Sequence, residues 1–296
     1  MILAVTGITG HTGSYFLQEL IDHHFDGVLR VLVRESSDLS ALDASGLKVE
    51  KVFGSLQNDA DLDRLAAGAD KILHIAGIRA TLPLLKAAGK AGVRGHIVLV
   101  HTTGIYSKHR MASGEYKEIE EQLRPFLERG MNITILRPTI IFGDMRDKQF
   151  HKFIQMVDRF PVMPQIDGGR AFIQPVNARD LGRAYYQCLM KDRLPELDYV
   201  CSGSRRLSVR EMCSLIGIFL GKKTRFVSVP MFLGVAGAKG VKALSGGRVD
   251  YIEKVLRLGE DRSFSHEQAA RDFGFEPEPF EIGLKREVEE YLHGKA

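Results

Sequence analysis

The sequence contains no tryptophan, only three cysteines and no long apolar run. Cys188, Cys201 and Cys213 lack the spacing of metal ligands, and an odd cysteine count without a signal-peptide pattern is typical of reduced thiols. The most apolar late stretch, residues 227–238, contains Pro230 and is too short to span a bilayer. These absences predict no metal site, no membrane partner and a cytoplasmic location.

An excess of charge of one sign is also absent. The chain has 41 Lys and Arg against 37 Asp and Glu, and no basic stripe is interleaved with aromatic residues. We therefore expect no nucleic-acid partner. With 296 residues, of which 44% are hydrophobic, the chain is long enough for two domains and an ample core.

Short β-branched runs alternate with amphipathic segments along the first half of the chain. Strands are predicted at residues 2–6, 29–33, 48–53, 71–75, 96–100 and 133–136, and helices at 14–21, 82–91 and 116–129. Continuous apolar strands are typical of a parallel sheet that is buried on both faces. The pattern predicts an α/β fold, a doubly wound parallel sheet with helices on both faces.

The regular alternation of predicted strands and helices ends after residue 144. Helices are predicted at residues 150–160, 177–191, 209–220 and 281–292, and strands at 171–176 and 199–201. We expect a smaller domain over 144–296, of which the segment at about 171–191 returns to the sheet of residues 1–143.

A glycine-rich turn joins the first strand to the first helix. Gly7, Gly10 and Gly13 recur at three-residue spacing, with Thr9, His11 and Thr12 between them. A phosphate needs backbone N–H donors at a helix N-terminus and a turn without bulky side chains. This loop stands between an apolar strand and an amphipathic helix, as that chemistry requires. It predicts a dinucleotide bound by a Rossmann domain.

Several segments resemble the extended and atypical branch of the short-chain dehydrogenase/reductases, the superfamily of NAD-dependent epimerases and dehydratases. They are residues 72–77, 98–106, 137–143, 174–181 and 283–284, together with the glycine loop, and they span almost the whole chain. The resemblance implies a smaller C-terminal substrate domain. It also implies cofactor contacts at Ala76, Gly77, Pro138, Thr139 and Ile140.

The residue that selects between NAD and NADP is expected about 20 residues beyond the loop. Arg34 stands there, and a guanidinium suits a 2′-phosphate, so NADP(H) is favoured. Glu35 is adjacent and leaves NAD as the alternative. The resemblance places Ser55 and Leu56 against the adenine, with Ser55 at the position where the family usually has Asp.

The resemblance also implies a catalytic Tyr and Lys four residues apart on one helix, with a Ser or Thr nearby. In one register Tyr116 is the acid, but Glu120 replaces the lysine; in the other Lys117 is the lysine, but Ser113 replaces the tyrosine. We prefer the second register, in which Lys117 binds the ribose and the general acid is unassigned.

Further candidates surround this helix. Thr102 is the candidate for the catalytic hydroxyl, and Thr103 is its neighbour. Tyr116, Tyr106 and His109 stay open as candidates for the acid.

Two functions follow from these residues. The first is an NADP(H)-dependent oxidoreductase or epimerase/dehydratase-type enzyme that acts by hydride transfer on a small carbonyl or sugar-like substrate. The alternative is a catalytically silent dinucleotide-sensing regulator (NmrA-like), suggested by the missing tyrosine at position 113. The substrate is expected near Thr102, residues 141–145, Phe172 and Met231, in a mainly apolar pocket where Arg146 and Arg170 could meet an anion. Such a lining favours a small carbonyl compound over a nucleotide sugar, which needs more hydrogen-bonding and cationic partners. A homodimer is left open.

Overall fold

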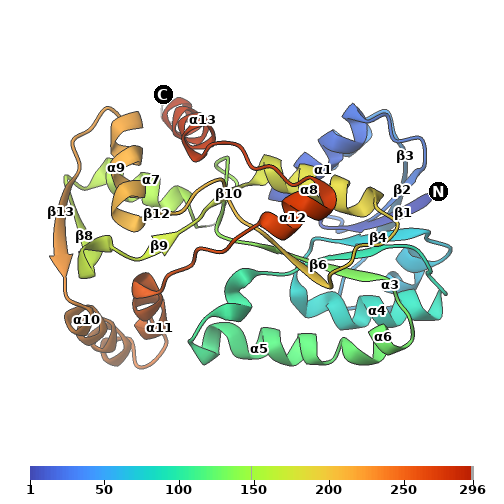
Figure 1. Cartoon of the computed structure of the whole chain (residues 1–296), viewed down its shortest axis with the longest axis horizontal. Coiled ribbons are helices and arrows are strands. Elements are labelled where there is room, and N and C mark those ends of the chain that lie inside the picture. Colours follow the sequence, from blue (N-terminus) through green and yellow to red (C-terminus); the bar gives the residue numbers. More distant parts are fainter. Residues whose placement is uncertain (148, 295–296) are drawn as a thin grey trace.

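A seven-stranded sheet forms the centre of the molecule (Figure 1). The computed structural model describes residues 1–147 and 149–294. The strands of the sheet are β1 (Ile2–Thr6), β2 (Val28–Val33), β3 (Lys48–Phe53), β4 (Lys71–His74), β5 (Ile97–Val100), β6 (Ile133–Pro138) and β11 (Asp198–Cys201). Their order is β11-β6-β5-β4-β1-β2-β3, and every neighbouring pair is parallel.

The order of the strands reverses beside β1. The chain first moves outward from β1 to β2 and β3, and then returns to β4 on the other side of β1. The carboxyl ends of β1 and β4 therefore open a crevice, which is the usual place for a ligand in this kind of sheet.

Helices cover both faces of the sheet. One face carries α1 (His11–Asp22), α8 (Ala178–Met190) and α12 (Glu267–Phe273), and the other carries α3 (Asp59–Ala66), α4 (Thr81–Lys90), α5 (Arg110–Glu121) and α6 (Arg124–Glu128). Because side chains alternate along a strand, Leu3 and Val5 pack under α1 while Ala4 packs toward α3 and α4. A short helix, α2 (Ser40–Asp43), precedes β3.

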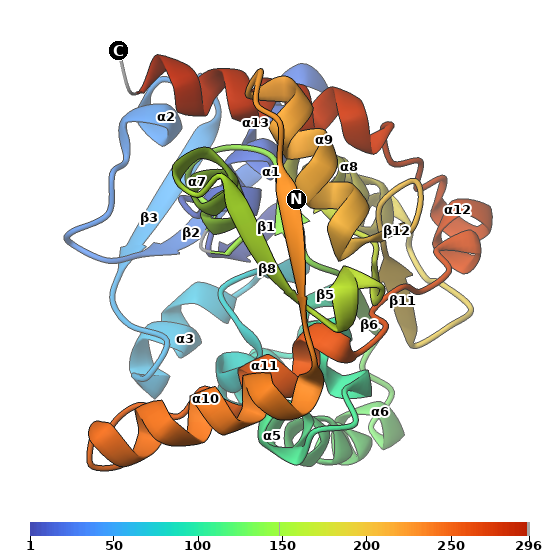
Figure 2. The same ribbon diagram turned by 90° about the vertical axis from the view of Figure 1, so that its left-hand side faces the viewer.

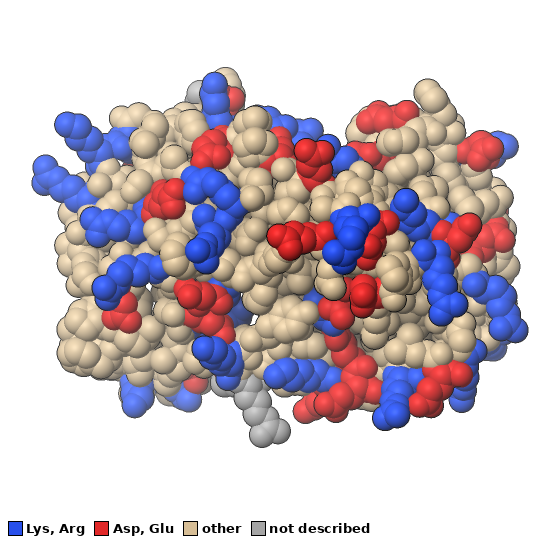
Figure 3. All heavy atoms as spheres, in the orientation of Figure 1, with Lys and Arg blue, Asp and Glu red and all other residues tan. Residues whose placement is uncertain are grey.

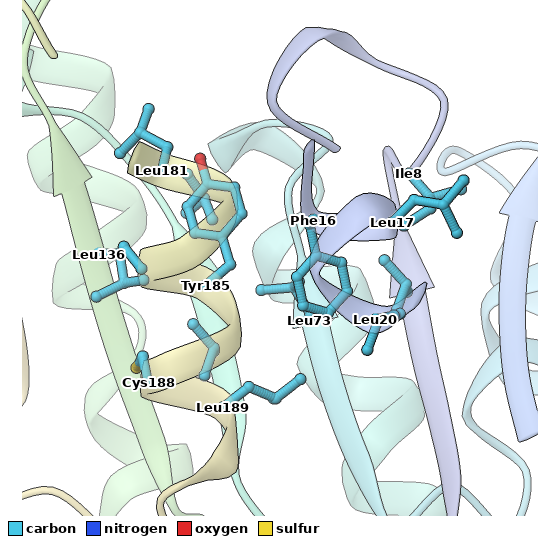
Figure 4. Packing of buried hydrophobic residues seen from close by; sticks show 14 of the residues in the cluster. Ile8, Phe16, Leu17, Leu20, Leu73, Leu136, Leu181, Tyr185, Cys188 and Leu189 are labelled. Carbon is cyan, nitrogen blue, oxygen red and sulfur yellow. The ribbon is translucent and has the colours of Figure 1, made fainter. Parts of the chain in front are cut away.

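The helices α1 and α8 lie against each other as well as against the sheet. Figure 4 shows Phe16 and Leu20 of α1 beside Tyr185 and Leu189 of α8, all fully buried. A Cβ on Gly182 would lie 2.6 Å from the backbone of Tyr15, so glycine permits this close approach. The packing fixes the N-terminus of α1, which carries the glycine loop.

The smaller unit has a hydrophobic core of its own, in which the rings of Phe142, Phe150 and Phe280 meet. Its elements are seen from the side in Figure 2. They are β7 (Ile141–Phe142), α7 (His151–Arg159), β8 (Val162–Ile166), β9 (Phe172–Ile173), β10 (Val176–Asn177), β12 (Leu207–Ser208), α9 (Val209–Phe219), β13 (Arg225–Val229), α10 (Met231–Leu244), α11 (Ile252–Leu256) and α13 (Phe280–His293).

The predicted fold class, a parallel α/β sheet with helices on both faces, is confirmed. The segment over 171–191 supplies α8, and the strand that joins the sheet is β11. The boundary at residue 143 stays a prediction.

Two predicted elements differ from those observed. The helix expected over residues 116–129 begins at Arg110 and is divided into α5 and α6. Pro125 has no N–H to donate to the carbonyl of Glu121, so the first helix ends there. The strand expected over 171–176 is divided into β9 and β10, because Pro175 cannot donate to a ladder.

Candidate functional site

The glycine loop lies at the carboxyl end of β1 and leads into α1. Gly7 has a φ of +78°, and a Cβ on Gly13 would lie 2.1 Å from the carbonyl oxygen of Gly7. No side chain caps α1, and its first turn has no acidic residue. The backbone donors of this turn are therefore available to an anion, and the loop fits a dinucleotide pyrophosphate.

A second wall of the crevice follows β4. The His74 ring lies 2.7 Å from the hydroxyl of Thr6 and 2.9 Å from the carbonyl oxygen of Gly77. Burial lowers the pKa of His74 to about 4, so the ring is neutral. It ties the ends of β1 and β4 together and fixes the positions of Ala76 and Gly77 beside the loop.

One cavity of about 870 Å³ extends from the glycine loop to the smaller unit. The predicted site residues that line it are Gly7, Gly10, His11, Thr12, Ala76, Gly77, Thr102, Thr103, Tyr106, Tyr116, Pro138, Thr139, Ile140, Ile141 and Arg146. Those that do not line it are Thr9, Gly13, Arg34, Ser55, Leu56, His109 and Lys117. Phe172, Met231 and Arg170, which were expected near the substrate, do not line it either.

Thr102 and Thr103, which follow β5, place their hydroxyl groups on one side of the cavity. Thr102 accepts a hydrogen bond from the backbone N–H of Gly104 at 3.0 Å, and Thr103 donates to the carbonyl of Pro138. A Cβ on Gly104 would lie 3.3 Å from the Tyr116 ring, so glycine lets that ring lie close to Thr102. Thr102 and Tyr116 therefore share one wall.

The helix α5 presents Tyr116 and Glu120 toward the sheet, four residues apart. Lys117 lies one position further round the helix and is exposed, whereas Ser113 is buried and donates to the carbonyl of His109. Tyr116 lines the cavity and Lys117 does not. The choice between the two registers and the ribose contact of Lys117 stay predictions.

Glu120 is held in a network that the sequence analysis missed. Arg137 donates to both carboxylate oxygens, at 2.6 and 2.7 Å, and Nδ1 of His101 lies 2.8 Å away. Burial raises the pKa of Glu120, but the bonds from His101 and Arg137 outweigh it and lower the pKa to about 2. Asp198 accepts from Nε of Arg137. Glu120, which stands where the Tyr116 register expects a lysine, is thus neutralised by Arg137. Its negative charge is not left unpaired beside Tyr116.

A second ionic cluster covers the start of α1. Asp144 accepts from Tyr15 at 2.8 Å, pairs with the guanidinium of Arg146, and lies 3.2 Å from Nε2 of His11. Burial raises the pKa of Asp144, but the bonds to His11 and Arg146 place it far below its usual range. Arg146 therefore lies beside the phosphate loop, at the cavity edge.

The smaller unit contributes charged residues that the sequence analysis did not predict. Lys254, Arg257 and Arg262 line the cavity together with four carboxylates, Asp250, Glu253, Glu260 and Asp261. The Nε atoms of Arg257 and Arg262 are buried and have no hydrogen-bond partner among the described residues. Burial and the nearby charge of Arg257 lower the pKa of Arg262. No motif marks the three cationic residues in the sequence; only their charge was visible.

The predicted adenosine side lies outside this cavity. Arg34 is exposed and directly follows β2, which pairs with β1. Ser55 follows β3, and its backbone N–H donates to Asp61 at 2.8 Å. Leu56 packs against the core under α3. All three lie at carboxyl ends of strands, as a dinucleotide extended across β1 and β2 requires.

Neither a cluster of metal ligands nor a membrane-spanning helix is found in the part of the chain that the structure describes. In residues 1–147 and 149–294, no group of three or more His, Cys, Asp or Glu is placed to hold a metal ion. The same residues form no helix with the length and apolar composition needed to cross a bilayer.

Comparisons with known proteins agree with this architecture. The model of a family described as NAD(P)H-binding matches residues 7–155. No curated protein sequence gave a significant match. A dTDP-glucose 4,6-dehydratase from Streptomyces venezuelae, solved with NAD, has a TM-score of 0.73 at 20% identity, covering 100% of this chain and 98% of its own.

Two further solved structures have the same fold. A nucleoside-diphosphate-sugar epimerase from Pseudomonas aeruginosa has a TM-score of 0.75 at 18% identity, covering 99% of this chain and 98% of its own. A UDP-glucose 4-epimerase from Thermotoga maritima has a TM-score of 0.72 at 17% identity, with both chains covered completely. The chain belongs to the NAD(P)H-binding family and has the fold of the extended short-chain dehydrogenase/reductases, the superfamily of NAD-dependent epimerases and dehydratases.

Proposed function

We propose that this chain is an NADP(H)-dependent oxidoreductase or epimerase/dehydratase-type enzyme that acts on a sugar-like substrate carrying an anionic group. The observation that carries the proposal is the single cavity that joins the phosphate loop, the pair Thr102 and Tyr116, and the arginines of the smaller unit.

The cofactor would be held by the residues around β1. Gly7, Gly10 and Gly13 shape the loop for the pyrophosphate, and Arg34 is the proposed partner of the 2′-phosphate. Ser55 and Leu56 are proposed to contact the adenine. The nicotinamide supplies a hydride acceptor or donor when bound.

Tyr116 is the proposed proton carrier for the substrate oxygen, and Thr102 is proposed to orient that oxygen. Both line the same wall, and the charge of Glu120 is matched by Arg137. A positioned proton carrier contributes about 10²–10⁴-fold to such a step.

The substrate's anionic group is assigned to Arg257 and Arg262. Both Nε atoms are buried at the cavity wall without a hydrogen bond, and that of Arg257 lies 4.0 Å from a carboxylate oxygen of Glu260. The buried Nε donor of Arg262 is costly to leave unsatisfied, and an anion would satisfy it. The names of the structural neighbours, which include UDP-glucose and dTDP-glucose enzymes, favour a nucleotide-diphosphate sugar. A small carbonyl compound is the other substrate class. The three free, buried cysteines agree with a cytoplasmic location.

A substrate panel tests this proposal. The protein is incubated with NADPH or NADP⁺ and nucleotide sugars, sugars and small ketones, and both cofactor absorbance and product formation by NMR are followed. We expect turnover of an anionic sugar, a KM about tenfold higher or more for Arg262→Gln, and little effect of Arg206→Gln, an exposed arginine outside this cavity. Turnover of neutral ketones only, with unchanged KM in Arg262→Gln, would reject the anionic substrate.

A cofactor-sensing regulator is the second candidate. It is favoured by the position of Lys117, which is exposed, so that α5 itself places no lysine beside Tyr116 in the cavity. Tight NADPH binding without turnover of any panel member, together with a change of protein partner on adding NADPH, would support this function instead.

A further inference from the structure

Positive charge is concentrated in one segment of the chain. Residues 204–249 contain nine of the 41 Lys and Arg but only one of the 37 Asp and Glu, Glu211, so the rest of the chain is net negative. The segment forms α9, β13 and α10 of the smaller unit. In Figure 3, Lys and Arg outnumber Asp and Glu on the left-hand part of the visible surface. The elements α9, β13 and α10 lie in the same part of Figure 1.

The helix α10 within this segment leaves its outer face uncovered. Phe232 is 70% exposed, Leu233 52% and Leu244 92%, whereas only Ala238 of the helix is buried. At 3.6 residues per turn, Phe232, Leu233 and Leu244 fall on the side opposite Ala238, with small residues between them. A soluble monomer rarely exposes such a face without a partner.

The inner face of α10 is anchored, so the exposed face is not a packing defect. The backbone N–H of Met231 donates to Asp167, and a Cβ on Gly234 would lie 2.6 Å from Ile166 and 3.0 Å from Val255. The helix is thus packed closely on β8 and α11. Figure 2 shows α10 extending beyond the rest of the molecule, and we call its outer side, with Phe232, Leu233 and Leu244, the ridge.

Cations border this ridge. Lys239 lies on α10, and Arg248 follows it. Both are exposed, and neither forms an ion pair within the part of the chain that the structure describes. An apolar helix face bordered by unpaired Lys and Arg complements an anionic lipid surface, which takes up apolar side chains and attracts the cations.

We infer that α10 docks this protein onto the surface of an anionic membrane, as a peripheral helix lying in the interface. A second copy of the chain fits less well, because two such basic segments would repel each other. An acidic protein would need a groove to receive the ridge. The expectation of no membrane partner rested on the lack of a segment long enough to span a bilayer, and a surface helix needs no such segment.

Docking would also orient the candidate site. The helix α11 follows α10 directly and lines the cavity with Glu253 and Lys254. Docking through α10 therefore brings this wall of the cavity next to the lipid surface. The inference does not depend on turnover and is tested without a substrate.

The experiment is vesicle co-sedimentation with the full-length protein. Vesicles of phosphatidylcholine alone are compared with vesicles that contain phosphatidylglycerol, at low and high salt. We expect sedimentation with the anionic vesicles only, weakened by salt because exposed charges are screened. Lys239→Glu and Arg248→Glu should each weaken binding by about fivefold or more.

The variants Phe232→Ser and Leu244→Ser remove the apolar contribution. Matched controls are Ile282→Ser and Lys285→Glu on α13, which are also exposed. Unchanged circular dichroism and NADPH affinity show that each variant is folded. The inference requires that the α10 variants lose vesicle binding and the α13 variants keep it.

Three results would overturn it. The wild type could stay in the supernatant with anionic vesicles, or the α10 and α13 variants could sediment alike. The third is a homodimer or a complex with an acidic protein that forms through α10 while vesicles are not bound, as analytical ultracentrifugation would reveal.

Discussion

Arg137 of β6 donates to both carboxylate oxygens of Glu120 on α5, at 2.6 and 2.7 Å, and so links this helix to the sheet. Glu120 occupies the position where the Tyr116 register calls for a lysine. The ion pair explains how a carboxylate is accommodated there, because Arg137 and His101 surround it with donors.

This pair predicts a pronounced loss of stability in Glu120→Gln. The substitution leaves buried Arg137 with Asp198 as its one remaining carboxylate, and breaking a buried pair costs about 3 kcal/mol. Urea unfolding measures the loss. The control is Glu118→Gln on the exposed side of the same helix, which should change little. Equal stabilities of the two variants would show that the ion pair does not matter for folding.

The same pair predicts acid sensitivity. The pKa of Glu120 is lowered from 4.5 to about 2 in the folded state, so its contribution is complete above about pH 4.5 and is lost as the pH falls toward 2. Unfolding midpoints measured between pH 2 and pH 6 should fall less steeply for Glu120→Gln than for the wild type. Parallel pH profiles of the two proteins would contradict this assignment.

Glu287 of α13 predicts the opposite pH dependence. It accepts from the backbone N–H of Gly143; burial and the nearby charge of Asp147 raise its pKa to about 9. A group with a raised acidic pKa holds a proton in the folded state, so stability falls as the pH rises from about 4.5 toward 9, by at most about 1.4 kcal/mol per unit.

Glu287→Gln should therefore flatten this decline and raise the Tm above pH 7. The amide keeps the acceptor for Gly143 and stays neutral. Differential scanning calorimetry from pH 5 to pH 9 measures the effect, and Glu289→Gln on the exposed side of α13 is the control. A lower Tm for Glu287→Gln at every pH would mean that the carboxylate is needed in its charged form.

The two registers of α5 make different predictions. If Tyr116 carries the proton, Tyr116→Phe lowers kcat by about 10²-fold or more with little change in the Kd for NADPH. Lys117→Ala should leave both unchanged, because Lys117 is exposed outside the cavity. Weaker NADPH binding in Lys117→Ala alone would restore the register preferred from the sequence.

Arg34 is predicted to select NADP(H). Arg34→Ala should raise the Kd for NADPH by about tenfold or more and leave that for NADH unchanged, since only the 2′-phosphate is lost as a partner. Fluorescence titration measures both constants, with Arg129→Ala at the end of α6 as an exposed control. An unchanged NADPH affinity would remove Arg34 from the site.

Periodicity and the glycine loop were sufficient to predict the sheet and its cofactor edge. The central strands β1 and β5 are apolar runs that are almost entirely buried, whereas in the edge strand β3 the apolar residues alternate with Lys and Glu and no residue is buried. The division between α5 and α6 was missed because Pro125 lies inside an otherwise helical pattern. The spacing of apolar residues thus predicts which strands are buried, but it does not show where a helix is interrupted.

The charged part of the cavity was not predictable in the same way. Glu120 and Arg137 meet because α5 packs beside β6, and no spacing rule reports that contact. Arg257 and Arg262 come from an irregular stretch that has no motif, and only the fold brings them to the cavity of the glycine loop.

The glycine loop is predicted to bind a dinucleotide, and calorimetric titration with NADPH measures that binding. Gly10→Asp places a carboxylate at an exposed position of the loop whose Cβ needs only a small shift, being 3.1 Å from the oxygen of Gly7. Gly89→Asp on α4 is the control, where a Cβ meets open space. We predict saturable binding of one NADPH by the wild type and by Gly89→Asp, and none by folded Gly10→Asp. Failure of the wild type to bind NADPH or NADH, or undiminished binding by Gly10→Asp, would contradict the claim.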